Sequence, residues 1–432
     1  MIHKYFAVAA RGIERVTAAE LEQLGAQNVQ PVFGGVHFEG DMLLLYRASL
    51  WLRTASRILR PLREFAAQTQ EMLYSQARRV RWEDYLDASK TLAVQATIEG
   101  AASRAAERST GSPPGRGDRG RETRGRDPRS SDTRGRDFHR KPVRQGIDNS
   151  MFAALKVKDA IVDRLRREQG ARPNVDKDSP DIIVHAHFAG GRCILSLDAT
   201  GTSLHERGYR VRGTAAPLKE TLAAAIVDLT GWDCQSPFFD PMCGSGTLVI
   251  EAAMKAMRIA PGLLRPSFGF QRWPQYEGKV WQQVVEDAKK QRLPAPPGGI
   301  FGADVSADAI AAADENACRA GVGDVIRFKG GRFEETTAPA PGPGVMVFNP
   351  PYGERLGQDA ELQPLYEKIG PLLTERFAGW KAFVLAGNLA LARHITLPAT
   401  DKVKLNNGPL DCRLLKFEPQ VHAPVDAVAV AE

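Results

Sequence analysis

The C-terminal half of the chain carries short apolar runs that alternate with stretches of helical periodicity. Each run is continuous rather than apolar at every second position, which is typical of strands buried on both faces of a parallel sheet. Helices between such strands cover the two faces of the sheet. The pattern begins near Lys219 and predicts an α/β domain. The runs are Phe238–Phe239, Gly299–Phe301, Val345–Phe348 and Ala382–Leu385.

A glycine-rich segment, Phe238–Thr247, begins with the first of these runs and leads into a helical stretch. A strand, a glycine turn and a helix in this order form the ligand site of open α/β sheets, and Gly244 and Gly246 permit close backbone approach. Asp240 at the strand end suits a ligand with a cationic amino-acid end, which favours S-adenosylmethionine over a dinucleotide. The segment lacks the G-x-G-x-x-G spacing and a P-loop lysine. A purely structural turn is the alternative.

An acidic residue ends the second run. Asp304 lies one strand–helix unit after the glycine-rich segment, where a carboxylate can accept hydrogen bonds from ribose hydroxyls. The structural alternative is that Asp304 or Ser306 only caps the helix that follows.

The third run leads into Asn349-Pro350-Pro351-Tyr352. The two prolines stiffen the loop and remove two N–H donors. An exocyclic amine could donate its two hydrogens to the Asn349 side-chain oxygen and the Pro350 carbonyl, while Tyr352 stacks on a flipped-out base. Transfer from a sulfonium needs no strong general base, so catalysis would be mainly positioning. The alternative is a proline-rich loop that merely ends a strand.

The N-terminal half reads as two α+β units, residues 1–60 and 65–200. Residues 101–146 interrupt the second unit with twelve Arg and one Lys against six acidic residues, which is the whole net charge of +7. This segment has almost nothing to bury, so we expect it to be disordered. It could be a passive spacer or a tether for RNA phosphates.

Several classes of protein and site are disfavoured. No apolar run reaches eighteen residues, so we expect no membrane span. The N-terminus lacks the pattern of a secretory leader, and five scattered cysteines are typical of reduced thiols, so we expect a cytoplasmic protein. His185 and His187 share a strand face, but two histidines make a poor metal site, and we expect no metal.

Beyond these motifs, the chain resembles the THUMP-containing RNA guanine-N2 methyltransferases over nearly its whole length. Three further segments are similar to the bacterial branch that makes N2-methylguanosine in 23S ribosomal RNA: Ala260–Gly262, Asn349–Leu356 and Asn407–Cys412. The segments that carry the wider resemblance are Lys156–Asp163, Gly170–Pro173, Ser203–Arg210 and Ala216–Ala225.

The resemblance implies a fold and a domain order. It implies a Rossmann-like class I methyltransferase domain with a mostly parallel seven-stranded sheet, preceded by a ferredoxin-like and THUMP α+β region that binds RNA. The implied domains are a ferredoxin-like unit at 1–64, a THUMP domain at 65–204 with the Arg/Gly-rich insertion 101–146, a methyltransferase domain at 205–420 and a flexible tail at 421–432.

It also implies residue roles. Asp240 and Gly244 would contact the methionine end of S-adenosylmethionine and Asp304 its ribose, with Cys243 and Gly246 in the same cofactor site. Asn349, Pro350 and Tyr352 would form the catalytic loop. The chain departs from the family at 329–334, where no Asp stands in the place of the usual acidic residue near adenine. It also holds one glycine-rich loop, which implies one activity.

The resulting hypothesis is methylation of a guanine N2 amine in 23S ribosomal RNA or a large-subunit assembly intermediate. Three alternatives stay open. The first is the same reaction on transfer RNA. The second is methylation of adenine N6 or glutamine N5, which share the loop. The third is an RNA-binding ribosome-assembly factor with a vestigial methyltransferase fold.

Overall fold

The computed structural model describes residues 1–99, 147–211, 218–353 and 359–420. The predicted insertion 101–146 and the predicted tail 421–432 lie outside these residues. The chain divides into two compact units, which are described separately. One unit combines Met1–Pro61 with Leu197–Glu432, and the other is Leu62–Ser196.

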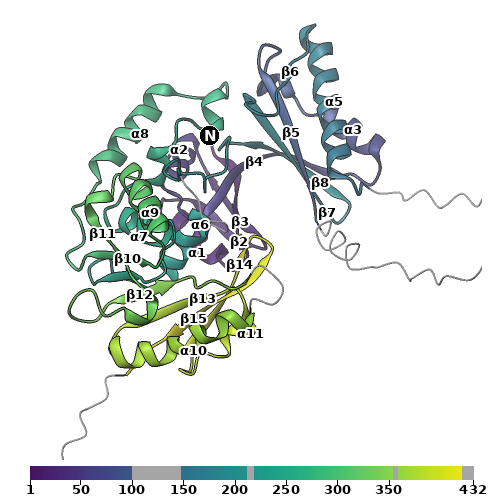
Figure 1. The fold of residues 1–432 in the computed structure, drawn as a ribbon. Coiled ribbons are helices and arrows are strands. Elements are labelled where there is room, and N and C mark those ends of the chain that lie inside the picture. The colour runs from purple at the N-terminus through teal and green to yellow at the C-terminus, as the bar shows by residue number, and fades with distance from the viewer. Residues whose placement is uncertain (100–146, 212–217, 354–358, 421–432) are drawn as a thin grey trace, which may run out of the picture. The chain divides into compact units, whose positions relative to one another are not determined.

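The first unit contains a seven-stranded sheet in the order β11-β10-β9-β12-β13-β15-β14 (Figure 1). Five neighbouring strands are parallel, and β15 runs antiparallel to both β13 and β14. The predicted mostly parallel sheet is therefore confirmed. The strands are β9 (Phe238–Asp240), β10 (Ile300–Asp304), β11 (Ile326–Gly330), β12 (Val345–Phe348), β13 (Lys381–Ala386), β14 (Asp401–Asn407) and β15 (Leu410–Phe417).

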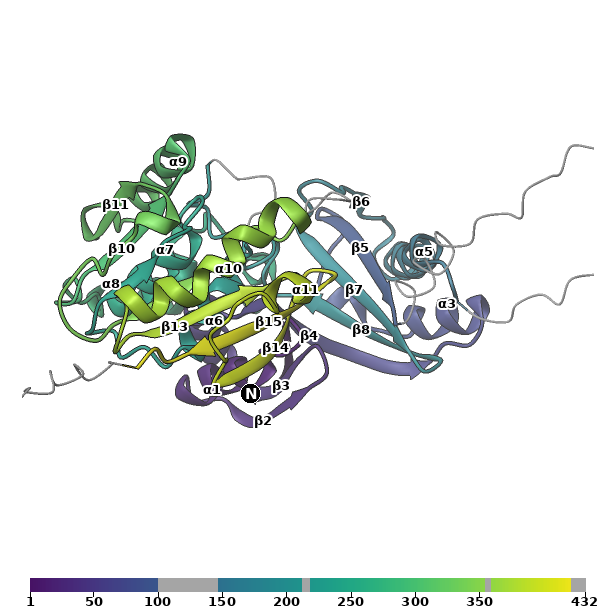
Figure 2. The ribbon, with the colours of Figure 1, turned by 60° about the horizontal axis from the view of Figure 1, so that its bottom comes forward.

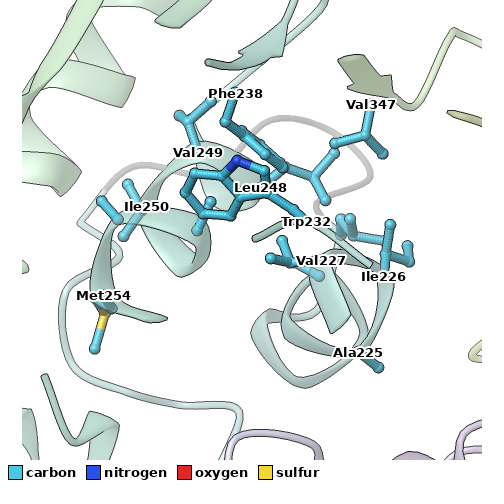
Figure 3. Packing of buried hydrophobic residues seen from close by; sticks show 14 of the residues in the cluster. Ala225, Ile226, Val227, Trp232, Phe238, Leu248, Val249, Ile250, Met254 and Val347 are labelled. Atoms are coloured by element: carbon cyan, nitrogen blue, oxygen red, sulfur yellow. The ribbon is translucent and has the colours of Figure 1, made fainter. Parts of the chain in front are cut away.

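Two apolar cores cover the two faces of this sheet, because successive side chains of a strand point to opposite faces. Phe238 belongs to one core and Phe239 to the other, and Ile300 and Phe301 divide in the same way. Figure 3 shows Phe238 and Val347 packed with Trp232 and side chains of α6 and α7. On the opposite face α10 lies over β13 (Figure 2). The helices are α6 (Glu220–Leu229), α7 (Thr247–Ala256), α8 (Gly278–Lys290), α9 (Ala307–Arg319), α10 (Asp359–Arg376) and α11 (Leu389–Ala392).

The N-terminal part of the same unit has the element order βαββαβ. Its antiparallel strands lie in the order β2-β3-β1-β4, which is the ferredoxin-like arrangement. Asp41 begins α2 by accepting a 2.8 Å hydrogen bond from the Leu44 N–H. The elements are β1 (His3–Ala9), α1 (Glu14–Gln23), β2 (Gln27–Val32), β3 (Gly35–Gly40), α2 (Met42–Trp51) and β4 (Ala55–Ala66), within which the chain enters the second unit.

The second unit is a small α/β structure. Its strand β5 runs parallel to both β6 and β7. Helix α5 packs against β5 and α3. Gly170 ends α5 in the left-handed conformation, at φ 73°, which glycine adopts without strain. The elements are α3 (Gln70–Arg78), β5 (Thr91–Ile98), α5 (Ser150–Gln169), β6 (Asn174–Val175), β7 (Ile182–Ala189) and β8 (Arg192–Asp198).

Short 3-10 helices complete the elements: η1 (Trp82–Asp84), η2 (Pro261–Leu264), η3 (Gly269–Arg272), η4 (Gly323–Val325) and η5 (Phe333–Glu335). Helix η2 contains most of the segment Ala260–Gly262, and its packing gives a structural reason for the glycine there. Gly262 presses on α2 so closely that a Cβ there would lie 2.6 Å from the Leu50 Cα atom. Only glycine permits that approach between the ferredoxin-like and methyltransferase parts.

A buried ionic network joins the same two parts. Arg207, which is 2% exposed, lies 3.4 Å from a Glu251 carboxylate oxygen and donates to the backbone carbonyls of Leu204 and Arg53. Tyr209 donates to the same Glu251 oxygen at 3.2 Å. The Arg53 guanidinium in turn donates to the Ile259 carbonyl at 2.7 Å. These contacts pair charges that would be costly to bury alone, although the Arg53 Nη1 and Glu251 Oε2 atoms have no hydrogen-bond partner among the described residues.

A partly buried carboxylic acid in the N-terminal part, Glu20, predicts a pH dependence of stability. Burial, with Asp228 adding to it, raises the pKa of Glu20 to about 7. An acid whose pKa is higher in the folded state holds extra protons there, so the free energy of unfolding should fall as pH rises from about 4.5 to about 7. Glu20→Gln should flatten this part of the profile in urea titrations. An unchanged slope in the variant would show that other groups cause the dependence.

Among the residues that the structure describes, no helix has the length and apolar character to cross a membrane. Within the same residues, no group of three or more His, Cys, Asp or Glu side chains could hold a metal ion.

Candidate active site

A cleft of about 890 Å³ opens at the carboxyl ends of the parallel strands. It lies where the strand order reverses, since β10 and β12 flank β9 on opposite sides. Open α/β sheets bind their ligands at such a point. The cleft brings together seven of the eight predicted site residues: Asp240, Cys243, Gly244, Asp304, Asn349, Pro350 and Tyr352.

The eighth, Gly246, lies behind the cleft and is absent from its lining. It begins α7 with φ 83°, and a Cβ there would lie 3.0 Å from the Ala313 Cβ. Its lack of a side chain lets α7 approach α9, so Gly246 has a packing role in this structure, and its contact with the cofactor stays a prediction.

Asp240 ends β9 at the start of the glycine-rich loop and lines the cleft. Its carboxylate is 1% exposed and accepts a 3.0 Å hydrogen bond from the Met242 N–H. Burial raises the pKa of Asp240 well above its usual range, and the nearby Asp304 carboxylate acts in the same direction. A cationic group in the cleft would offset both effects, so the site is electrostatically suited to a positively charged ligand.

Asp304 connects the second strand to the glycine-rich loop. One of its oxygens accepts from the Gly244 N–H and the other from the Ser306 N–H, both at 2.9 Å. Ser306, rather than Asp304, caps α9 through the Ala309 N–H. Asp304 therefore fixes the loop beside it, and each of its oxygens retains a lone pair for a ligand hydroxyl.

Behind the loop, two polar side chains hold it from the side away from the cleft. Arg210 donates to the Ser245 and Thr247 hydroxyls at 3.0 and 2.9 Å. Asn316, which is fully buried on α9, donates to the Ser245 carbonyl at 3.0 Å. Sequence reasoning missed both residues, although Arg210 stands in one of the segments that carry the family resemblance.

The Asn-Pro-Pro-Tyr loop leaves β12 on the other side of the cleft. The Asn349 side-chain oxygen is buried and has no hydrogen-bond partner in the described structure. An unsatisfied buried acceptor costs roughly 1–3 kcal/mol, and such groups recur where a ligand supplies the missing donor. This amide is therefore the feature of the cleft that most directly indicates an N–H donor as the substrate group.

Two residues that the sequence analysis missed hold this loop in place. Tyr366 on α10 donates its hydroxyl to the Pro351 carbonyl at 3.1 Å, and the Asn388 amide donates to the Tyr352 carbonyl at 3.3 Å. The Tyr352 ring lies against Gly387, where a Cβ would come within 2.9 Å of the ring. Asn388 also begins α11 as its N-cap, a signal that the sequence does contain.

The stretch without the usual acidic residue forms part of the cleft wall. Phe333 packs on Phe348 with ring centroids 5.4 Å apart, and Arg332 and Glu334 line the cleft on either side of it. Val305, which is 71% exposed, stands beside Asp304 at the same wall. Phe333 and Val305 offer an apolar surface at this wall, and the Glu334 carboxylate there is paired with Lys368 at 3.1 Å.

The strand order, the glycine-rich loop and the acidic strand ends together define a class I methyltransferase. Three family models match the chain: a RlmL ferredoxin-like domain at residues 4–59, a THUMP domain at 137–198 and an RMKL-like methyltransferase domain at 207–416.

Similar proteins cover nearly the whole chain. A Synechocystis protein named "Putative RNA methyltransferase slr0064" is 38% identical over 96% of both chains. The ribosomal RNA large subunit methyltransferase K/L of Syntrophotalea carbinolica is 41% identical over 96% of this chain, which spans 53% of that relative's length. The crystal structure of SMU.472, a putative methyltransferase complexed with SAH, matches with a TM-score of 0.79 at 30% identity, covering 98% of this chain and 99% of that one.

The chain therefore belongs to the RNA methyltransferase family that combines these ferredoxin-like, THUMP and methyltransferase domains. The predicted family, fold class and S-adenosylmethionine cofactor are confirmed, and RNA is the substrate class. The chain spans about half the length of the K/L relative that it matches.

Proposed function

We propose that the chain transfers a methyl group from S-adenosylmethionine to the N2 amine of a guanine in 23S ribosomal RNA. The observation that carries the reaction type is the buried, unpartnered Asn349 oxygen in a cleft that also holds Asp240 and Asp304. The choice of RNA follows the K/L relative, whose name specifies large-subunit ribosomal RNA.

The cofactor side of the cleft fits S-adenosylmethionine. Its sulfonium supplies an electrophilic methyl group when bound. Asp240 and the Gly244 turn would hold the amino-acid end, because the two neighbouring carboxylates favour a cationic ligand. Asp304 would accept from the ribose hydroxyls, and Val305 and Phe333 would enclose the adenine between apolar surfaces.

The substrate side would act by positioning. The amine would donate one hydrogen to the Asn349 side-chain oxygen and the other to the Pro350 carbonyl, which leaves the nitrogen lone pair for the attack. The methylated amine loses its proton readily, so the loop does not have to supply a strong base. Tyr352 would stack on the extruded base, and Tyr366 and Asn388 would fix the loop that carries these groups.

The proposed domains follow the prediction, with the ferredoxin-like unit at 1–64 and the THUMP domain at 65–204 holding the RNA and residues 205–420 performing the transfer. Recognition would rest on RNA shape and phosphates more than on sequence. The insertion 101–146 would add charge-driven affinity, and a cytoplasmic location would give access to ribosomal RNA.

A transfer assay separates ribosomal RNA from transfer RNA. Purified protein with radiolabelled S-adenosylmethionine should label 23S RNA from cells that lack the gene and leave 23S RNA from parental cells unlabelled, since its site is already modified. Labelling of the transfer RNA pool alone would replace the ribosomal assignment with the transfer RNA alternative. No transfer to any RNA, despite cofactor binding, would favour the assembly factor with a vestigial fold.

Asp304→Ala should weaken S-adenosylmethionine binding by roughly 1–3 kcal/mol. The ribose hydroxyls lose their acceptor, and the Gly244 N–H loses its hydrogen bond to the Asp304 carboxylate. Titration calorimetry measures this directly. Ser306→Ala is the matched control, because it removes only the α9 cap and should leave the dissociation constant unchanged. Equal dissociation constants for Asp304→Ala and the wild type would contradict the ribose role.

A further inference from the structure

A second cleft, of about 930 Å³, lies between α2 and α8 and shares no lining residue with the first cleft. Helix α2 presents Leu43, Arg47 and Trp51 to it, at a spacing of four residues that places them on one helix face. Helix α8 presents Lys279 and Val280 from the opposite side. The two helices pack side by side, as Figure 1 also shows.

The lining of this cleft has an excess of positive charge. It contains five basic residues, Arg47, Arg53, Lys255, Arg258 and Lys279, and two acidic ones, Glu20 and Asp287. Asp287 is engaged by Gln283 of its own helix at 2.9 Å. The raised pKa of Glu20, at about 7, reduces its negative charge at neutral pH.

Three of the cations have binding capacity to spare. Arg47 and Lys279 are exposed, and neither makes an ion pair among the described residues, whereas Lys255 is paired with Asp228 at 2.5 Å. Arg53 is buried, with 8% of its surface exposed. Its Nη2 atom donates to the Met254 and Ile259 carbonyls, whereas its Nη1 atom has no hydrogen-bond partner among the described residues. The backbone thus fixes a guanidinium whose second amino group remains unsatisfied, which is the arrangement that suits an anionic oxygen.

We propose that this cleft is a second RNA-binding site, in which Arg47, Arg53 and Lys279 hold a backbone phosphate. Trp51 and Val280 form an apolar wall on which the adjoining ribose or base packs, a combination that single-stranded RNA sites share. This proposal rests on the proposed function in that the substrate is RNA, but it does not depend on which base is methylated.

The test uses the full chain with Arg47→Glu and Lys279→Glu combined. Both side chains are exposed, so the fold should survive, and an unchanged S-adenosylmethionine dissociation constant checks this. RNA affinity, measured by fluorescence anisotropy over a range of salt concentrations, should fall by at least about tenfold. Because the contact to that phosphate is lost, the slope of log affinity against log salt should become shallower by about 0.7. KM for RNA should rise while kcat at saturating RNA stays the same.

Arg15→Glu with Arg319→Glu is the matched control, because both residues are exposed outside the cleft lining, neither makes an ion pair among the described residues, and the charge change is identical. Its salt slope should match the wild type. If the two double variants have the same RNA affinity and slope, the proposal is wrong. If adenosine monophosphate or inorganic phosphate binds the wild type but not Arg47→Glu/Lys279→Glu, while the RNA slope is unchanged, the cleft serves a free phosphate ligand instead of RNA.

Discussion

Asn349→Ala should lower kcat for RNA methylation by on the order of 100–1,000-fold while S-adenosylmethionine binds as before. The side-chain oxygen is buried without a partner, so the substrate amine would be the donor that satisfies it. Without it the amine loses one of its two acceptors and is free to rotate away from the attack geometry. Single-turnover transfer and cofactor calorimetry, made on the same preparation, separate the two effects.

Tyr366→Phe is the control for this variant. It removes only the 3.1 Å hydrogen bond to the Pro351 carbonyl and leaves Asn349 in place. Its loss of activity should therefore be much smaller. A parallel loss of cofactor affinity in Asn349→Ala would show that the loop holds the cofactor rather than the amine, and the assignment of roles would be wrong.

The largest effect on stability should come from Arg207→Met, at about 3–5 kcal/mol in the free energy of unfolding. The methionine fills similar space, but it leaves the Glu251 carboxylate without its buried cation. Burial already raises the pKa of Glu251, and the charge of Arg207 opposes that shift. Urea titration measures the change.

Adding Glu251→Gln to Arg207→Met supplies the control. The neutral amide removes the uncompensated charge, so the double variant should be more stable than Arg207→Met alone. A single variant that loses less than about 1 kcal/mol would mean that the network contributes little, as many exposed ion pairs do.

The sequence predicted the parts of the fold that local pattern determines. Continuous apolar runs identified β9, β10, β12 and β13, because residues such as Phe238 and Phe239 are buried on opposite faces of one sheet. Those strand ends share one edge, so Asp240, Asp304 and Asn349 could be expected to converge, and the cleft contains all three. Their individual roles stay predictions.

The contacts that the sequence could not predict join residues far apart in the chain. The hydrogen bond from Asn388 to the Tyr352 carbonyl crosses 36 residues, and the Arg207–Glu251 pair crosses 44. No local periodicity encodes such a pairing, since it depends on how helices and loops dock. Gly246 shows a further limit, because a glycine required for helix packing cannot be distinguished in sequence from one required for ligand approach.

The most direct test of the proposed reaction is nucleoside mass spectrometry of RNA treated with the purified protein and S-adenosylmethionine. The RNA is 23S ribosomal RNA from cells that lack the gene, and Asn349→Ala protein is the parallel control. We expect one new product, N2-methylguanosine, in a single fragment of the RNA, and none with the variant. A methyl group on adenine N6, or on any atom other than guanine N2, would contradict it.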